Sequence, residues 1–549
     1  MFRPVRYAPR SGALLAALGA SLLAACSTSV SRKPDATNVS EAQPATPAFN
    51  VEEASLTDLR RRLDSGELTS HALVQQYLDR IAAIDKGGPA LNAVIEPNPD
   101  ALAIADALDA ERRDGKRRGP LHGIPVLLKD NVDTADAMQT SAGSLALVGA
   151  PAAQDAGLVT RLREAGAVIL GKTNLSEWAN FRSTRSTSGW SARGGQTRNP
   201  YVLDRNPCGS SSGSAVAVSA NLAALAVGTE TDGSIVCPSA VNGVVGIKPT
   251  VGLISRAGIV PIAHSQDTAG SMARSVADAA VLLGALAGSD VRDKASWDAD
   301  RHAADYAAAL DANGLRGARL GVLRKSAGFN PDVDAALDRA IAALRAGGAT
   351  VVDPVELPNA GKYGEDELTV LLFEFKADLN AYLATRRGVP IDSLAALIAF
   401  NQHESAREMP WFGQELFVQA QAKGPLTDKA YREAAARAKR LAGREGIDAL
   451  LRKHNLDALV LPSNAPAWPT DPANGDHVTG GDTSPAAVAG YPSITVPMGL
   501  VHELPVGLSF VGTAWSEAKL IRYAHAFEQA THARRPPRFL PTLDTTPTP

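Results

Sequence analysis

The sequence predicts an α/β protein with a single large, mixed and mainly parallel sheet that is covered by helices. Segments with helical spacing alternate with short apolar runs of strand length through most of the chain. Such alternation is typical of helices packed on the faces of a sheet. The composition agrees, because 45% of the residues are hydrophobic, 21% are charged, and 47 glycines are available for turns.

The individual elements follow along the chain. Thr69 is an N-cap candidate for a helix whose apolar residues recur at three- and four-residue spacing from Leu73 to Ile84. Further helices are predicted at 101–113 and 157–165. Residues 124–128 form a continuous apolar run, typical of a buried strand, that ends at Lys129. The other predicted strands are 94–95, 167–170, 320–323, 350–352, 458–461, 494–496 and 506–511.

A mostly helical stretch at 360–450 interrupts this alternation, and we expect it to form a cap over the functional site. No linker divides the rest of the chain, so residues 51–540 are predicted to form one large domain. Residues 541–549, rich in threonine and proline, are predicted to be a disordered tail.

The first 25 residues are typical of a signal peptide. Three arginines precede an apolar run at 13–25, which is too short to span a bilayer as a permanent helix. The run ends in Leu23-Ala24-Ala25-Cys26, which resembles the lipobox of bacterial lipoproteins and implies lipidation of Cys26. Cleavage at an ordinary signal-peptidase site is the alternative.

Residues 26–50 are rich in Ser, Thr, Ala and Pro and are predicted to be a flexible tether with a reach of about 27 Å. Together with the lipobox, this predicts a protein of the bacterial cell envelope that contacts the membrane through its lipid anchor only. The anchor would lie at the outer membrane or on the periplasmic side.

The composition predicts few partners. A net charge of −3 gives no electrostatic reason to expect nucleic acid, and we expect a monomer. The ten histidines are scattered, without an H-E-x-x-H motif or Cys/His ligand spacing, so neither a metal nor another cofactor is predicted. Cys208 and Cys237 remain beside two serine turns, and the sequence leaves open whether they form a disulfide.

These two glycine-flanked turns, around Ser210 and Ser234, carry the candidate chemistry. Serine is a weak nucleophile unless another group accepts its proton, and here a second hydroxyl and Lys129 can form a relay. Small residues in the second turn let backbone N–H groups point inward, as an oxyanion hole requires. The predicted donors are the N–H groups of Thr231, Asp232, Gly233 and Ser234.

Other motifs have simpler interpretations. A G-x-S-x-G nucleophile elbow centred on Ser211 requires a buried strand directly before it, whereas Arg205-Asn206-Pro207 precede this loop. The loop is otherwise a flexible segment or an anion-binding helix N-terminus. Lys172 and His122 are interpreted as structural, and Ser516 in Ser-x-x-Lys as a helix N-cap. Asn174 and Asp267 are expected to hold loops near the site.

Five segments in order, LHGIPVLLKDN, GKTNLSEWA, CGSSSGS, GTETDGSI and NGVVGIKPT, resemble the amidase signature hydrolases. The resemblance covers about residues 55–540, and two longer stretches are similar to bacterial peptide amidase, which removes the C-terminal amide from peptides. It implies a catalytic triad of Lys129, Ser210 and Ser234, a cis bond between Gly209 and Ser210, and an acyl-enzyme at Ser234. Lys129 would need a pKa well below about 10.4, which burial can supply.

The chain also departs from the family pattern. Asp232 and Val236 stand where most members carry Gly and Arg, which favours the peptide amidase subgroup. The expected substrate is an amidated peptide or another small amide, and the lipobox argues against the family's cytosolic tRNA-linked role. We expect segments 178–198 and 360–450 to line the pocket. Two alternatives remain: a non-catalytic envelope lipoprotein with the same fold, and an esterase of α/β-hydrolase type that uses Ser211.

Overall fold

The computed structural model describes residues 49–544. The predicted signal peptide, the predicted lipidation site Cys26, nearly all of the predicted tether and the end of the tail lie outside the described residues. Residues from Asn50 onward form one compact unit. None of the described helices combines the length and the apolar character that crossing a membrane requires.

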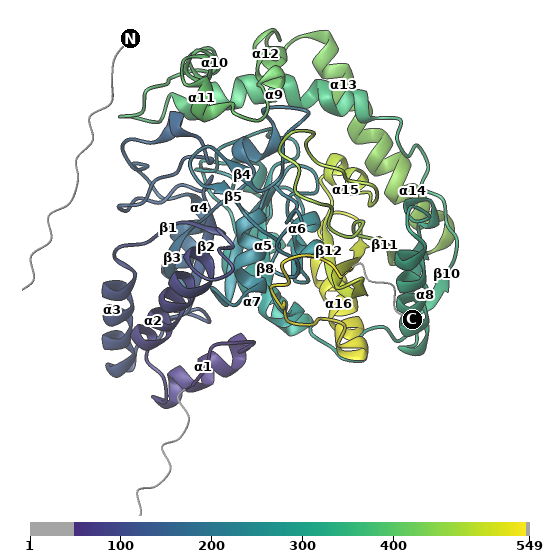
Figure 1. Ribbon diagram of the computed structural model, residues 1–549. Helices are drawn as coiled ribbons and strands as arrows, with labels where there is room; N and C mark the ends of the chain where they lie inside the picture. The colour runs from purple at the N-terminus through teal and green to yellow at the C-terminus, as the bar shows by residue number, and fades with distance from the viewer. Residues whose placement is uncertain (1–48, 545–549) are drawn as a thin grey trace, which may run out of the picture. The chain divides into compact units, whose positions relative to one another are not determined.

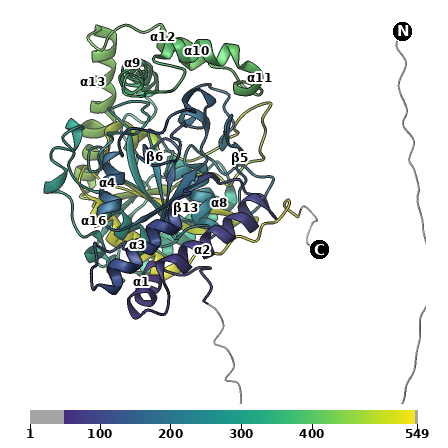
Figure 2. The ribbon, with the colours of Figure 1, turned by 90° about the vertical axis from the view of Figure 1, so that its left-hand side faces the viewer.

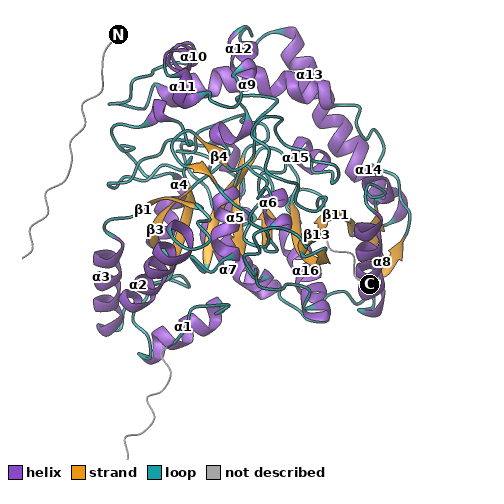
Figure 3. Cartoon of the chain, in the orientation of Figure 1, coloured by secondary structure: helices purple, strands orange, loops and turns teal. Residues whose placement is uncertain are grey.

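An 11-stranded sheet runs through this unit (Figures 1 and 3). A separate two-stranded sheet pairs β4 (Trp190–Ser191) with β5 (Gly195–Gln196). The strand order of the large sheet is β1 (Val94–Pro97), β3 (Val168–Thr173), β2 (Pro125–Lys129), β6 (Leu225–Glu230), β8 (Thr268–Ala273), β7 (Val245–Lys248), β12 (Ser493–Val501), β13 (Leu504–Val511), β11 (Ala458–Pro462), β9 (Arg319–Val322) and β10 (Thr350–Val352).

The predicted mixed sheet covered by helices is confirmed, and its parallel pairs lie in two blocks. Strand β2 is parallel to β3 and β6, and β9 is parallel to β10 and β11. The strands between the blocks pair in antiparallel fashion. The short connection between β12 and β13 accounts for the antiparallel pairing of these two strands, because a tight hairpin can only join antiparallel strands.

Helices surround the strands, as Figure 3 shows. The Thr69 hydroxyl caps its helix as predicted, accepting a hydrogen bond from the Ala72 N–H at 3.0 Å. The helices outside the cap are α1 (Leu56–Ser65), α2 (Ser70–Arg80), α3 (Ala101–Arg113), α4 (Gly157–Glu164), α5 (Ser212–Ser219), α6 (Val236–Val241), α7 (Val276–Leu286), α8 (Pro331–Ala346), α14 (Asp448–His454), α15 (Ser484–Ala489) and α16 (Glu517–Thr531).

The expected helical cap lies above the loops at one end of the sheet, at the top of Figures 1 and 2. Two of its aromatic residues pack on one segment of the main body, residues 178–181. Phe417 lies 5.9 Å from Trp178 and Phe375 lies 5.1 Å from Phe181, measured between ring centroids. The cap consists of α9 (Gly364–Leu383), α10 (Leu394–His403), α11 (Ser405–Glu408), α12 (Glu415–Gln421) and α13 (Lys429–Ala442).

Candidate active site

Strand β2 delivers Lys129 to the interior of the protein. All residues of β2 are buried, and the Lys129 side chain is 0% exposed. Its Nζ donates to Ser210 Oγ at 2.7 Å, to Thr229 Oγ1 at 2.8 Å and to the Thr229 carbonyl at 3.2 Å. Thr229 reaches the amine because its strand, β6, runs parallel to β2, so both strands end at the same edge of the sheet.

The surroundings of Lys129 favour its neutral form. Its hydrogen bonds go to two hydroxyls and a carbonyl, none of which is charged. Burial lowers the pKa of Lys129 to about 7, and the charges of Asp267 and Glu230 oppose this shift. A large fraction of the amine is therefore unprotonated near neutral pH, which a general base requires.

Ser210 lies in the loop before α5, and the Gly209–Ser210 peptide bond is cis, as the family resemblance implied. The Ser210 hydroxyl is fully buried and accepts its hydrogen bond from Lys129. The backbone carbonyl of Ser210 accepts a hydrogen bond from the Ser176 N–H at 3.1 Å. A Cβ on Gly209 would lie 2.1 Å from Ser176 Oγ, so only glycine fits beside this serine.

The neighbouring Ser211 has a different role. Its hydroxyl donates to the Thr229 carbonyl at 2.9 Å and accepts from the Thr229 N–H at 3.1 Å, which attaches the loop to β6. The Ser211 N–H donates to the Ser234 carbonyl at 3.2 Å. The fully buried Ser211 side chain is thus engaged in joining the two serine turns.

Ser234 lies in the turn between β6 and α6 and is 8% exposed. In the described part of the chain its hydroxyl forms no hydrogen bond with Ser210. Of the predicted relay, the structure therefore contains the hydrogen bond between Lys129 and Ser210 and not one between Ser210 and Ser234. Gly233 has a φ of +76°, and a Cβ there would approach Thr483 Oγ1 to 2.9 Å. The turn therefore requires glycine directly before Ser234.

The backbone N–H groups of this turn divide into two sets. Those of Ile235 and Val236 donate to Glu230 Oε2 at 2.7 and 3.0 Å, and that of Cys237 donates to the Gly233 carbonyl at 2.8 Å. Within residues 49–544, the preceding four N–H groups donate to no other protein group. These are the four predicted oxyanion-hole donors, Thr231, Asp232, Gly233 and Ser234.

Cys208 and Cys237 form a disulfide, with their Cα atoms 6.0 Å apart. The sequence had left this pairing open, because it does not report the distance between the two turns. One cysteine lies two residues before Ser210 and the other three residues after Ser234. The bond therefore ties the two serine turns together.

The two residues expected to hold loops do so. Asp267 Oδ1 accepts from the Thr231 hydroxyl at 2.6 Å, and its Oδ2 accepts from the backbone N–H groups of Ile262 and Ala263. Burial raises the pKa of Asp267 to about 6. Asn174 Nδ2 donates to the Gly195 carbonyl at 2.9 Å and so anchors the 178–198 segment.

Two carboxyl groups that the sequence did not predict, those of Glu367 and Asp482, lie near Asp232 in the turn of Ser234. Asp232 accepts from the hydroxyls of Thr483 and Ser484, each at 2.5 Å. Burial and the nearby Asp232 raise the pKa of Glu367 to about 8, and the same two causes raise the pKa of Asp482 to about 6. Glu367 comes from the cap and Asp482 from the loop before α15, so no sequence spacing brings them together.

The competing candidates are structural. Lys172 is buried and donates to the Val132 carbonyl at 2.6 Å and to Thr140 Oγ1 at 2.9 Å. The His122 ring contacts the Leu108 carbonyl at 3.0 Å. Ser516 occupies the N-cap position of α16, but its hydroxyl donates to the Thr513 carbonyl rather than capping the helix.

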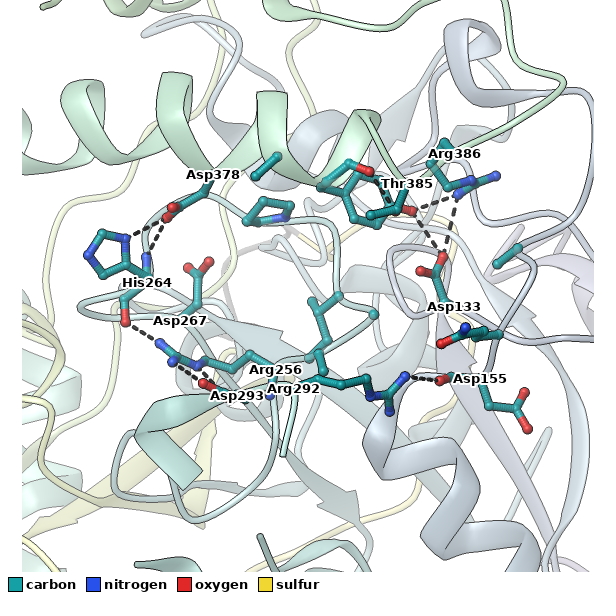
Figure 4. A pocket seen from close by; sticks show the side chains of 18 of the residues that line it. Asp133, Asp155, Arg256, His264, Asp267, Arg292, Asp293, Asp378, Thr385 and Arg386 are labelled. Carbon is teal, nitrogen blue, oxygen red and sulfur yellow. Dashed lines mark hydrogen bonds and ion pairs between the residues drawn. The ribbon is translucent and has the colours of Figure 1, made fainter. Parts of the chain in front are cut away.

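A cavity of about 510 Å³ lies between α9 and the loops below it (Figure 4). Asp267 and His264 line one wall, and Asp133 and Arg386 line the opposite wall. In the described part of the chain, one group has three side chains that could hold a metal ion: His264, Glu374 and Asp378. However, the two ring nitrogens of His264 face different carboxylates, Asp378 at 2.8 Å and Glu374 at 3.4 Å. This arrangement suits a protonated imidazole that donates to both.

The chain is similar to several known proteins over most of its length. The family model described as Amidase matches residues 72–521. A probable amidase of Arabidopsis thaliana is 45% identical over 503 residues, which cover 90% of this chain and 93% of the relative. The native peptide amidase of Stenotrophomonas maltophilia is 60% identical with a TM-score of 0.85, over 89% of this chain and 99% of that chain. A structure of the peptide amidase PAM with the competitive inhibitor chymostatin is also 60% identical, with a TM-score of 0.87, over 89% and 100%.

Proposed function

Because the chain belongs to the amidase family and is an amide-hydrolysing enzyme, we propose that it releases ammonia from C-terminally amidated peptides or other small primary amides. The observation that carries the chemical part of this proposal is the buried Lys129–Ser210 hydrogen bond of 2.7 Å, made by an amine whose pKa is lowered to about 7 by burial. The similarity to peptide amidases supports the choice of substrate.

The proposed reaction begins with proton transfer. Neutral Lys129 accepts a proton from Ser210, which accepts one from Ser234 as the Ser234 oxygen attacks the amide carbon. The carbonyl oxygen becomes an oxyanion that accepts hydrogen bonds from the unpaired N–H groups of the turn. The C–N bond then breaks, the relay returns a proton to the nitrogen, and ammonia leaves.

A water molecule completes the cycle. It loses a proton to the same relay, attacks the acyl-enzyme and releases the carboxylic acid, which restores the Ser234 hydroxyl. The net reaction consumes one amide and one water and yields one acid and one ammonia. The disulfide between Cys208 and Cys237 supports this assignment, because it keeps the loops of Ser210 and Ser234 in register.

The test measures ammonia release from an amidated dipeptide by the chain from residue 50 onward. We expect turnover by the wild type, loss of turnover in Ser234→Ala, and unchanged turnover in Ser516→Ala, whose hydroxyl only contacts the Thr513 carbonyl. No turnover of any member of an amide panel would instead favour a non-catalytic binding protein. Full activity in Lys129→Ala would favour the esterase mechanism that uses Ser211.

We also propose that the protein is a lipid-anchored envelope protein, lipidated at Cys26 at the end of the Leu23-Ala24-Ala25-Cys26 motif. Expression in a bacterium with labelled palmitate should label the wild type and place it in the membrane fraction. Cys26→Ser should remove both the label and the membrane association. Unlabelled protein in the soluble fraction of wild-type cells would contradict this proposal.

A further inference from the structure

Gln266 is a buried glutamine that the proposed mechanism does not use. It is 3% exposed and lies in a tight turn, in which the N–H groups of Gln266 and Asp267 both donate to the Ala263 carbonyl. Its Nε2 donates to the Thr231 carbonyl at 3.3 Å and to Glu367 Oε1 at 2.9 Å. Asp267, the next residue, binds the Thr231 hydroxyl, so the turn holds Thr231 at two points.

The hydrogen bond from Gln266 to the Thr231 carbonyl determines the direction of the Asp232 N–H. In a trans peptide bond the C=O and the following N–H point in opposite directions. Holding the Thr231 carbonyl therefore orients the Asp232 N–H, which is one of the unpaired donors. The Ser234 N–H is oriented in the same way, because the carbonyl of its peptide group, on Gly233, accepts from the Cys237 N–H.

We propose that Gln266 is a positioning residue of the oxyanion hole, which holds the Thr231 carbonyl so that the Asp232 N–H points at the developing oxyanion. This inference rests on the proposed amide hydrolysis at Ser234 and identifies one residue that makes the hole rigid. Gln266 does not touch the substrate. It acts through the Thr231–Asp232 peptide group.

The chemistry of the side chain suits this role. A carbonyl must be held by a donor, and the amide nitrogen of glutamine supplies two N–H groups in one plane. One goes to Thr231 and the other to Glu367, whose position on α9 stops the amide from rotating. Preorganised donors lower the barrier because they need not reorient when charge develops on the substrate.

The contact also joins the cap to the catalytic turn. Glu367 and Glu374 both lie on α9, and they bind consecutive residues of the same loop: Glu367 accepts from Gln266, and Glu374 accepts from the Ser265 N–H and hydroxyl. The cap helix thus fixes the loop whose glutamine fixes the Thr231 carbonyl. The oxyanion hole depends on cap docking through this path.

The test replaces Gln266 with methionine, which has a similar length and no N–H donor. Gln414→Met is the matched control, because Gln414 is also buried and its Nε2 donates to the backbone carbonyl of Ile398 at 3.0 Å, within the cap. With an amidated dipeptide we expect kcat of Gln266→Met to fall about 10- to 100-fold, with KM changed by less than about 3-fold. Gln414→Met should retain the wild-type kcat.

A second readout separates positioning from general damage. A peptide aldehyde forms a tetrahedral adduct with a serine nucleophile and places an oxyanion in the hole, whereas the matching peptide alcohol does not. Gln266→Met should bind the aldehyde about 10-fold more weakly and the alcohol unchanged. If this variant does not fold, Gln266→Asn, which keeps the amide on a shorter side chain, should show a smaller loss of the same kind.

The outcomes are distinct. A wild-type kcat in Gln266→Met, or an equal loss of affinity for aldehyde and alcohol, would overturn the positioning role while leaving amide hydrolysis intact. A wild-type protein that hydrolyses no amide would overturn the proposed function, and the positioning role would fall with it.

Discussion

Two buried lysines at the ends of neighbouring strands have different surroundings. Lys129 is the last residue of β2. Lys172 lies on the parallel strand β3, where it pairs with Leu128, the residue before Lys129. Both side chains are 0% exposed. Burial lowers the pKa of each, and it does so against the opposing charge of nearby carboxylates.

The difference lies in what each amine faces. Lys172 donates to a backbone carbonyl and a threonine, with Asp130 and Asp133 as the strongest opposing charges. Lys129 likewise donates to a backbone carbonyl and a threonine hydroxyl, both of Thr229, and it donates in addition to the Ser210 hydroxyl. Burial alone therefore does not make a base. In the proposed mechanism Lys129 becomes one because it also contacts the Ser210 hydroxyl, which can pass it a proton.

The largest expected effect separates the two lysines. Lys129→Met should lower kcat/KM about 10³- to 10⁴-fold, because it removes the proton acceptor, and should leave the protein folded. Lys172→Met should instead lower the free energy of unfolding by about 2–4 kcal/mol, because it removes both hydrogen bonds of the buried amine and takes away the cation that faces Asp130 and Asp133. Its activity per folded molecule should stay within about 3-fold of the wild type. Comparable losses of kcat/KM in the two variants, measured with thermal unfolding, would remove the distinction.

The next comparison concerns the serines that neighbour Lys129. Ser210→Ala should lower kcat about 10³-fold, because it breaks the path from Lys129 to Ser234. Ser211→Ala should mainly destabilise the fold, by about 1–3 kcal/mol, since its hydroxyl only bridges the N–H and carbonyl of Thr229. The two effects are separated by kinetics and by denaturant unfolding. A larger loss of kcat in Ser211→Ala than in Ser210→Ala would contradict the assignment.

The smallest expected effect concerns His264, whose raised pKa keeps its ring charged to a higher pH than that of a free histidine. The hydrogen bond to Asp378 raises the pKa of His264, and Glu374 acts in the same direction against burial and Arg256. Tyr431 also contacts Glu374, and Arg256 is paired with Asp293. Because the folded pKa is raised, the stabilisation is fully present below about pH 6.5 and is lost as the pH rises through the folded pKa.

His264→Gln should therefore lower the free energy of unfolding on the order of 1 kcal/mol or less at pH 5.5, since the ring is 44% exposed and solvent screens the pair. The loss should be smaller at pH 9, because the wild-type ring loses its charge as the pH rises through the folded pKa. Denaturant unfolding at the two pH values measures the difference. An equal loss at both would show that the ring acts by packing and not by charge.

Much of the fold follows from local sequence, and the remainder depends on contacts that sequence does not encode locally. The apolar run of β2 predicted a buried strand ending at Lys129, and the helix capped by Thr69 was also predicted. Strands β7 and β8 were missed, because VGIK and TAGSMA are short and contain glycine rather than a continuous apolar run. The antiparallel middle of the sheet was missed with them.

The site shows the same division. The residues of the two serine turns could be proposed as a site because they lie close together in sequence and resemble a family. Glu367 and Gln266 were missed, because they meet across 101 residues and their contact depends on how the cap docks. The disulfide was left open for the same reason, since the 6.0 Å between its Cα atoms is a property of the folded chain.

The dependence of kcat/KM on pH tests the central claim that neutral Lys129 is the base. It should rise about tenfold per pH unit on the acid side, bend near pH 7 and then level off, because burial lowers the pKa of Lys129 to about 7. Glu367→Gln should leave this bend in place, although it removes a carboxyl with a pKa of about 8 that burial and Asp232 have raised. A profile that is flat from pH 5.5 to 8.5, or that falls through pH 7, would contradict the role of Lys129.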